Sequence, residues 1–152
     1  MKVLKCLCVL GVLVQIGGGS QVLSEPGAPE NCPQIRKTPL APPAVYNLTN
    51  PLRPTDENIE AGRRLYQGEV QPLACKLCHG EKGDGRGAPD FAGTPPARNF
   101  ACGRTMNSLS DGQLFWIIRN GSPNTAMPAY TDTPPNDIWK MIHYLRGFSS
   151  PR

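Results

Sequence analysis

The sequence has little of what several common functional classes need. Only two of its 152 residues are histidine, 7% are aromatic, and 16 basic residues nearly balance 12 acidic ones, for a formal net charge of +4. This charge is too weak and too evenly spread to indicate a nucleic-acid-binding protein. No general acid–base pair or nucleophile constellation stands out either. The composition therefore argues against a nucleic-acid partner and against an enzyme with an ordinary catalytic dyad or triad.

Long hydrophobic runs are also missing. Residues 6–16 are almost entirely apolar, but a membrane-spanning helix needs about 20 such residues. Lysines precede this run and the small residues 17–20 follow it, an order typical of a secretory signal peptide. We predict a signal peptide over residues 1–20, removed together with Cys6 and Cys8, which follow no lipobox. The alternative is a retained signal anchor, because no strict A-x-A site is present; only then is membrane association expected.

The most specific motif is Cys75-Lys76-Leu77-Cys78-His79, the C-x-x-C-H signature of c-type haem attachment. On one helical turn residues three apart share a face, so both thiols can reach the two vinyl groups on one haem edge. His79 then supplies the proximal nitrogen ligand to the iron. The alternatives are a redox dithiol or half of a zinc site, but no second C-x-x-C motif exists and the only other histidine is His143. The motif predicts one haem c, bound covalently through Cys75 and Cys78.

Proline and glycine are abundant, at 17 and 16 residues, which leaves little room for a large aliphatic core. A buried haem resolves this, because its flat apolar surface gives loops and short helices something to pack on. Many prolines gather in residues 21–54, hereafter the lead, which we predict to be extended and without helix. The lead is either a disordered tether or a strap over the domain. Cys32 favours the strap, since surplus thiols in an exported protein tend to pair and Cys102 is the remaining partner.

Three segments have an apolar stripe at helical spacing and a capping residue in front of it. The haem motif begins a short helical turn between the first and the second. No convincing alternating strand pattern appears, so the predicted fold is all-α, with three to four short helices wrapped around one haem. The three segments are Asp56–Gln67 after Thr55, Asp111–Asn120 after Ser110, and residues 137–146 after Asn136.

Over residues 55–148 the chain resembles the monohaem class I cytochromes c, small secreted or periplasmic electron carriers; residues 149–152 are left as a tail. The resemblance rests on the haem motif with the glycine-rich turn 80–85, on residues 120–122 leading to Met127-Pro128, and on the last helix. It implies a bacterial, periplasmic protein. It also implies that the last helix crosses the first, where a glycine lets an aromatic ring approach closely; Gly62 and Tyr144 are the candidates.

The resemblance makes Met127 the distal axial ligand, because in the family the methionine of such a Met-Pro pair binds the iron. The other methionines fit less well: Met1 is in the leader, Met141 is on an apolar stripe, and Met106 is in a polar loop. His143 is the alternative sixth ligand, but it lies off the apolar stripe of its helix, which favours a solvated or rim position. The family also implies a proline carbonyl on the second nitrogen of His79, from Pro95 or Pro96.

Two further sets of residues have a functional and a structural interpretation. Trp116 and Trp139 are either electron relays or packing residues. A set of cations either forms a docking patch at the haem mouth or is simply solvated. This set is Lys82, Arg86, Arg98, Arg104 and Arg119.

His/Met ligation fills both axial positions and so favours outer-sphere electron transfer over ligand activation. We therefore expect an electron carrier rather than an enzyme. Its redox partners are a donor dehydrogenase or quinol-oxidising complex and an acceptor oxidase or reductase. The alternatives are a haem subunit fixed in a larger oxidoreductase, with the lead as a docking element, and a haem sensor or peroxidase-like enzyme with an open sixth site.

Overall fold

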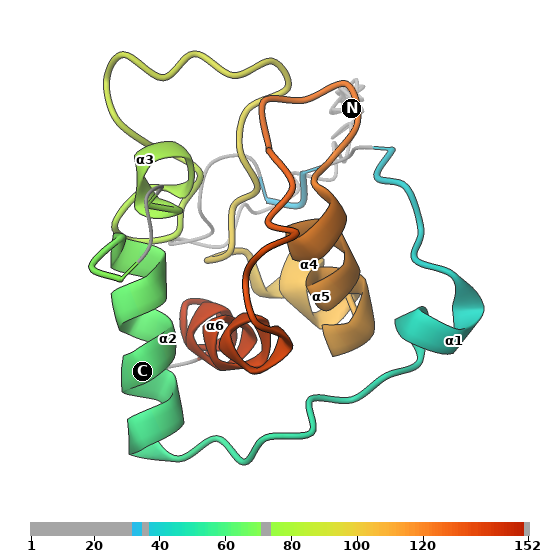
Figure 1. The fold of residues 1–152 in the computed structure, drawn as a ribbon. Helices are drawn as coiled ribbons and strands as arrows, with labels where there is room; N and C mark the ends of the chain where they lie inside the picture. The colour runs from blue at the N-terminus through green and yellow to red at the C-terminus, as the bar shows by residue number, and fades with distance from the viewer. Residues whose placement is uncertain (1–31, 35–36, 71–73, 151–152) are drawn as a thin grey trace, which may run out of the picture.

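The computed structural model describes residues 32–34, 37–70 and 74–150, and within them the chain forms six α-helices and no β-strand (Figure 1). The all-α prediction is confirmed. The predicted signal peptide lies outside the described residues. In the part of the chain that is described, no helix has the length and apolar character to cross a bilayer. The helices are α1 (Pro43–Tyr46), α2 (Asp56–Gln67), α3 (Lys76–His79), α4 (Gly103–Asn107), α5 (Asp111–Asn120) and α6 (Pro135–Gly147).

Helices α2 and α6 pack across each other and, with α5, form the centre of the fold (Figure 1). Tyr66 of α2 and Ile138 and Ile142 of α6 are completely buried in this core. The predicted crossing of the first and last long helices is therefore confirmed. This crossing matters for function because Tyr66 of α2 and Met141 of α6 also line the cavity described below.

Gly62 lets α6 approach α2 closely, as predicted, but the atoms that approach it are not those of the Tyr144 ring. The nearest neighbours of a side chain at Gly62 would be backbone atoms of Lys140 and Met141, and a Cβ would collide with the Lys140 carbonyl. Tyr144 lies one turn further along α6, where its ring packs 5.4 Å from that of Tyr66. Gly62 is therefore required for backbone contact between two helices rather than for a helix–ring contact.

Gly62→Ala is expected to lower the free energy of unfolding by about 1–3 kcal/mol, since backbone cannot yield as a flexible side chain can. Gly147→Ala is the matched control, because Gly147 ends α6 with open space around it. At Gly147 the same substitution should leave the free energy of unfolding unchanged or raise it by up to about 1 kcal/mol, because alanine has the higher helix propensity. Urea unfolding of both variants measures the difference; equal effects would mean that the crossing tolerates a methyl group.

The long helices begin and end largely as the sequence predicts. Thr55 caps α2 by accepting a hydrogen bond from the Asn58 N–H at 3.3 Å, and Ser110 caps α5 through the Gln113 N–H at 3.0 Å. The predicted Asn136 cap of α6 is wrong, because the helix starts two residues before the predicted Asp137, at Pro135, without a side-chain cap. Proline suits the first helical position, since its φ is already helical and its missing N–H would have no partner there.

The short helix α4 was not predicted, and it changes the place of Met106. The sequence suggests a polar loop there, but Met106 lies on α4 and is completely buried. One turn of helix is too short to show a hydrophobic period, so only the packing of α4 against the core reveals it. The Arg146 guanidinium of α6 holds α4 in place by donating hydrogen bonds to the carbonyls of Met106 and Leu109 and to the Asp111 carboxylate.

The lead contains a helical turn, α1, where we expected none. Its position is set by α5: a Cβ at Gly112 would collide with the Val45 carbonyl, and the Gly112 N–H donates to Leu48 at 3.1 Å. The Gln113 side chain adds two bonds, accepting from the Ala41 N–H at 2.8 Å and donating to the Pro39 carbonyl at 3.0 Å.

The predicted disulfide between Cys32 and Cys102 is confirmed, with the two Cα atoms 5.4 Å apart. It ties the first described residues of the lead to the residue before α4. Residues 21–31 of the lead lie outside the described residues, so a strap over its whole length stays a prediction.

Candidate haem site

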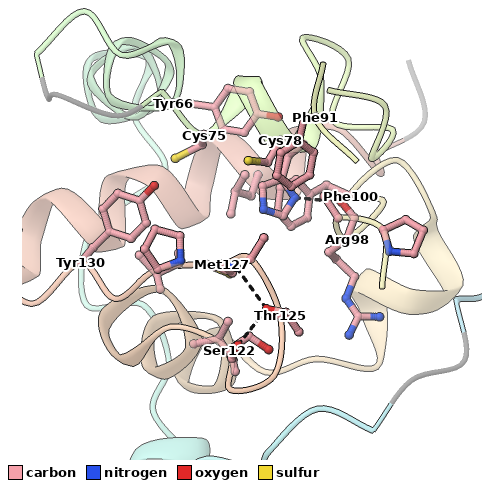
Figure 2. A pocket seen from close by; sticks show the side chains of 18 of the residues that line it. Tyr66, Cys75, Cys78, Phe91, Arg98, Phe100, Ser122, Thr125, Met127 and Tyr130 are labelled. Atoms are coloured by element: carbon pink, nitrogen blue, oxygen red, sulfur yellow. Dashed lines mark hydrogen bonds between the residues drawn. The ribbon is translucent and has the colours of Figure 1, made fainter. Parts of the chain in front are cut away.

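A cavity of about 970 Å³, part of it open to solvent, lies between α3, α5, α6 and the loop that follows α5 (Figure 2). The cavity walls are mostly apolar. Each of the four residues that the sequence analysis assigned to the haem lines it: Cys75, Cys78, His79 and Met127.

The C-x-x-C-H motif forms the short helix α3, as predicted. This turn places Cys75 and Cys78, neither of which is in a disulfide, on one side of the cavity (Figure 2). Burial raises the pKa of the Cys78 thiol.

His79 is held in a fixed orientation. Its ring is 8% exposed, stacks on Phe100 with the ring centres 4.4 Å apart, and places Nδ1 3.0 Å from the Arg98 carbonyl oxygen. A carbonyl can only accept, so Nδ1 carries the proton and Nε2 keeps its lone pair for a metal. The sequence analysis offered Pro95 or Pro96 for this contact and did not name Arg98; both prolines line the cavity.

The turn after His79 depends on glycine. Gly80, Gly83 and Gly85 have φ of 80°, 65° and 80°, which a side chain would strain. In this turn the Gly83 carbonyl accepts from the Phe100 N–H at 2.6 Å, and the Gly80 carbonyl accepts from the Tyr66 hydroxyl at 2.6 Å. The turn thereby brings Phe100, the ring that stacks on His79, into place.

Met127 lies across the cavity from the cysteines, on the loop after α5 (Figure 2). The loop is closed by its own hydrogen bonds. The Met127 N–H donates to the Thr125 hydroxyl at 3.1 Å, that hydroxyl donates to the Ser122 carbonyl at 2.8 Å, and the Ser122 N–H donates to the Met127 carbonyl at 3.2 Å. Gly121, with φ of 73°, turns the chain out of α5 and into this loop. The thioether is thus presented by an ordered loop.

Three other predicted candidates lie away from the cavity lining. His143 does not line the cavity; it is half-buried, with Nε2 2.9 Å from the Leu52 carbonyl oxygen, in agreement with the rim interpretation. Trp139 is buried with its ring stacked 4.4 Å from that of Phe115, which fits a packing role. Trp116 is half-buried on α5.

The predicted set of cations does not act as one patch. Lys82 and Arg86 are exposed, whereas Arg104 donates to the Cys32 carbonyl at 2.9 Å and so helps to hold the lead. The buried Nη1 of Arg119 has no hydrogen-bond partner among the residues that the structure describes. Arg98 lines the cavity and donates to the Thr38 hydroxyl at 2.8 Å. The sequence analysis included Arg98 among the cations at the haem mouth but did not distinguish it from the other four, because no local pattern shows which side chain a distant segment will turn inward.

The donor set fits haem c. Two thiols three residues apart, an imidazole oriented through its Nδ1, a thioether on another loop and apolar walls are what a covalently attached haem requires. Among the lining residues in the described part of the chain, Arg98 alone carries a permanent positive charge, which suits the carboxylates of the macrocycle.

Burial also shapes the chemistry of Tyr66, whose ring is completely buried. It raises the pKa of the phenol well above the ordinary value of about 10. Above pH 10 the unfolded chain therefore loses this proton while the folded chain keeps it. The free energy of unfolding then falls with pH, by about 1.4 kcal/mol per unit from this group.

Tyr66→Phe is expected to remove that pH dependence and to cost about 1 kcal/mol at neutral pH, through the lost bond to the Gly80 carbonyl. Part of the alkaline slope should remain, because burial also raises the pKa of Tyr130. Denaturant unfolding between pH 7 and 11 measures both effects. A variant with the wild-type slope would show that another group controls alkaline stability.

Fold and site together define a c-type cytochrome, an electron-transfer protein that uses haem c. The family model described as cytochrome c oxidase, cbb3-type, subunit III matches residues 57–145. The chain belongs to this family of monohaem c-type cytochrome domains. No curated protein is significantly similar to the chain.

A solved structure with the same fold is a chain of the reducing HAO-like protein complex of Kuenenia stuttgartiensis. The two chains are 24% identical, with a TM-score of 0.53, and the match covers 69% of this chain and 49% of that chain. The match thus spans about half the length of the relative. At this identity the likeness supports the fold alone.

Proposed function

We propose that the chain carries one haem c, bound through thioether bonds from Cys75 and Cys78, with His79 and Met127 as the axial ligands. The observation that carries this proposal is the convergence of these four side chains on one cavity from two separate parts of the chain. The Nδ1 contact of His79 supports it, because that contact leaves Nε2 as the metal-binding nitrogen.

Bound haem supplies an iron that gains or loses one electron. The residues of this chain then determine how easily it does so. If His79 and Met127 both bind the iron, a small ligand would have no position left, and this would favour outer-sphere electron transfer. The soft thioether of Met127 and the apolar walls both favour the ferrous state and so raise the reduction potential.

We infer from this arrangement a one-electron carrier that exchanges electrons with redox protein partners. A donor dehydrogenase or quinol-oxidising complex and an acceptor oxidase or reductase have the required chemistry. The proposal includes export to the periplasm, with residues 1–20 as the signal peptide. The disulfide between Cys32 and Cys102 supports export, because disulfides persist in oxidising compartments.

Expression with a functional haem-maturation system tests the cofactor. The purified protein should be coloured, with a mass equal to the processed chain plus one haem that denaturation does not remove. Its N-terminal residue should lie near residue 21. A colourless product with the mass of the bare chain would contradict the proposal.

The second candidate is a haem subunit fixed in a larger oxidoreductase. Two observations favour it: the family model is described as an oxidase subunit, and the solved relative comes from a protein complex. Size-exclusion chromatography of native soluble and membrane extracts separates the candidates. A carrier elutes alone at the size of the mature chain, whereas a subunit co-elutes with its complex.

A further inference from the structure

One peptide group links the lead to the proximal histidine. Its carbonyl, from Arg98, lies 3.0 Å from Nδ1 of His79, and its N–H, from Asn99, donates to Oε1 of Gln34 at 2.8 Å. This peptide bond is trans, so the two groups lie in one plane and point in opposite directions. Gln34 and His79 therefore bind the two ends of the same peptide dipole.

Gln34 is held firmly enough to orient this peptide group. Its Nε2 donates to the Ala97 carbonyl at 3.0 Å, so the side-chain amide forms hydrogen bonds with the backbone on both sides of Arg98. Two residues earlier, Cys32 is joined to Cys102 by the disulfide. A few residues later, the Thr38 hydroxyl accepts from the Arg98 guanidinium at 2.8 Å. The contacts of this part of the lead thus converge on the segment that carries the His79 partner.

The arrangement has an electronic consequence. Hydrogen bonds in series polarise one another, by about 10–30% per bond. An acceptor on the Asn99 N–H makes the Arg98 carbonyl oxygen more negative, which strengthens the bond from Nδ1 of His79. A stronger bond at Nδ1 makes the imidazole a better donor at Nε2 and favours the ferric state.

We propose that Gln34 is a positioning residue that acts through the Arg98–Asn99 peptide group on His79, and so lowers the reduction potential of the iron. This inference rests on the proposed ligation by His79. Gln34 lies outside residues 57–145, the part that matches the family, so the lead contributes a tuning contact to the haem domain.

The test uses the haem-loaded protein and two variants of Gln34. Gln34→Met keeps the length of the side chain and removes both hydrogen bonds. At a fixed ambient potential the ferrous-to-ferric ratio of this variant should rise about threefold. This rise corresponds to a reduction potential about 28 mV higher, since a tenfold change in the ratio is 59 mV for one electron. Gln34→Glu keeps an acceptor for the Asn99 N–H, so its ratio should stay at or below that of the wild type.

Asn50→Ala is the matched control. Asn50 is another amide of the lead, which donates to the Trp139 carbonyl at 2.8 Å and does not line the cavity. It should lose stability with no change in the ratio. A second readout is the Nδ1 proton of His79 in the ferrous protein, which should move upfield and exchange faster with solvent in Gln34→Met only.

A wild-type ratio in Gln34→Met, with a stability loss like that of Asn50→Ala, would overturn the proposal and leave Gln34 a purely structural residue. An equal shift in Asn50→Ala would overturn it as well. If Gln34→Met does not fold, Gln34→Glu decides: a ratio above that of the wild type refutes the proposal. A wild-type protein without covalent haem refutes the proposed function instead, and does so before any variant is compared.

Discussion

Met127→Ala is expected to abolish the far-red thioether–iron absorption band and to open the sixth coordination position. The ferrous haem of the wild-type protein should not bind carbon monoxide, whereas that of the variant should bind it readily. Loss of the soft sulfur ligand should also lower the reduction potential. The expected decrease is on the order of one hundred to a few hundred millivolts, within the roughly 0.8 V over which axial ligands set haem potentials. Visible spectroscopy and a redox titration measure both effects.

Met106→Leu is the control for this experiment. Met106 is completely buried on α4 and does not line the cavity, so a substitution of similar volume should leave the band and the potential unchanged. If the wild type lacks the band and binds carbon monoxide, the closed-site interpretation fails. The sensor or peroxidase-like alternative then becomes the better account.

Cys32→Ser is expected to lower the free energy of unfolding by about 4 kcal/mol. The disulfide closes a loop with a sequence separation of 70, and the chain-entropy model gives about 4 kcal/mol for a loop of that length. This is a large part of the roughly 5–15 kcal/mol that stabilises a typical domain. Cys102 stays in place in this variant, so the completely buried side chain and the Thr105 hydroxyl bond to it are retained.

Denaturant unfolding of the haem-loaded protein measures this loss. The slope of the unfolding free energy with denaturant should also increase, because the uncrosslinked unfolded chain exposes more surface. A loss below about 1 kcal/mol with an unchanged slope would show that the cross-link does not restrict the unfolded chain.

Local chemistry explains why much of this protein could be predicted. Helices α2 and α5 have caps and apolar stripes within their own residues, so Thr55 and Ser110 mark their starts correctly. The haem motif is equally local, because its three functional residues lie on one turn. The family resemblance also singled out Met127, through its Met-Pro pair, and Met127 lines the cavity.

Apart from the Asn136 cap of α6, the errors occur where a contact joins segments far apart in the chain. The partner of the His79 Nδ1 is the Arg98 carbonyl, and no periodicity distinguishes that carbonyl from those of Pro95 and Pro96. The burial of Met106 was missed because α4 is a single turn, and α1 was missed because it forms against α5.

The amino-acid sequence by itself determined the cofactor chemistry and the helical class, because thiol spacing, capping and apolar period act over a few residues. Only the tertiary structure decided which groups surround His79 and Met127. Packing across α2 and α6 excludes a side chain at Gly62, and the disulfide brings Gln34 onto the peptide group that binds His79. Such contacts depend on how distant segments meet, which is a property of the packed chain as a whole.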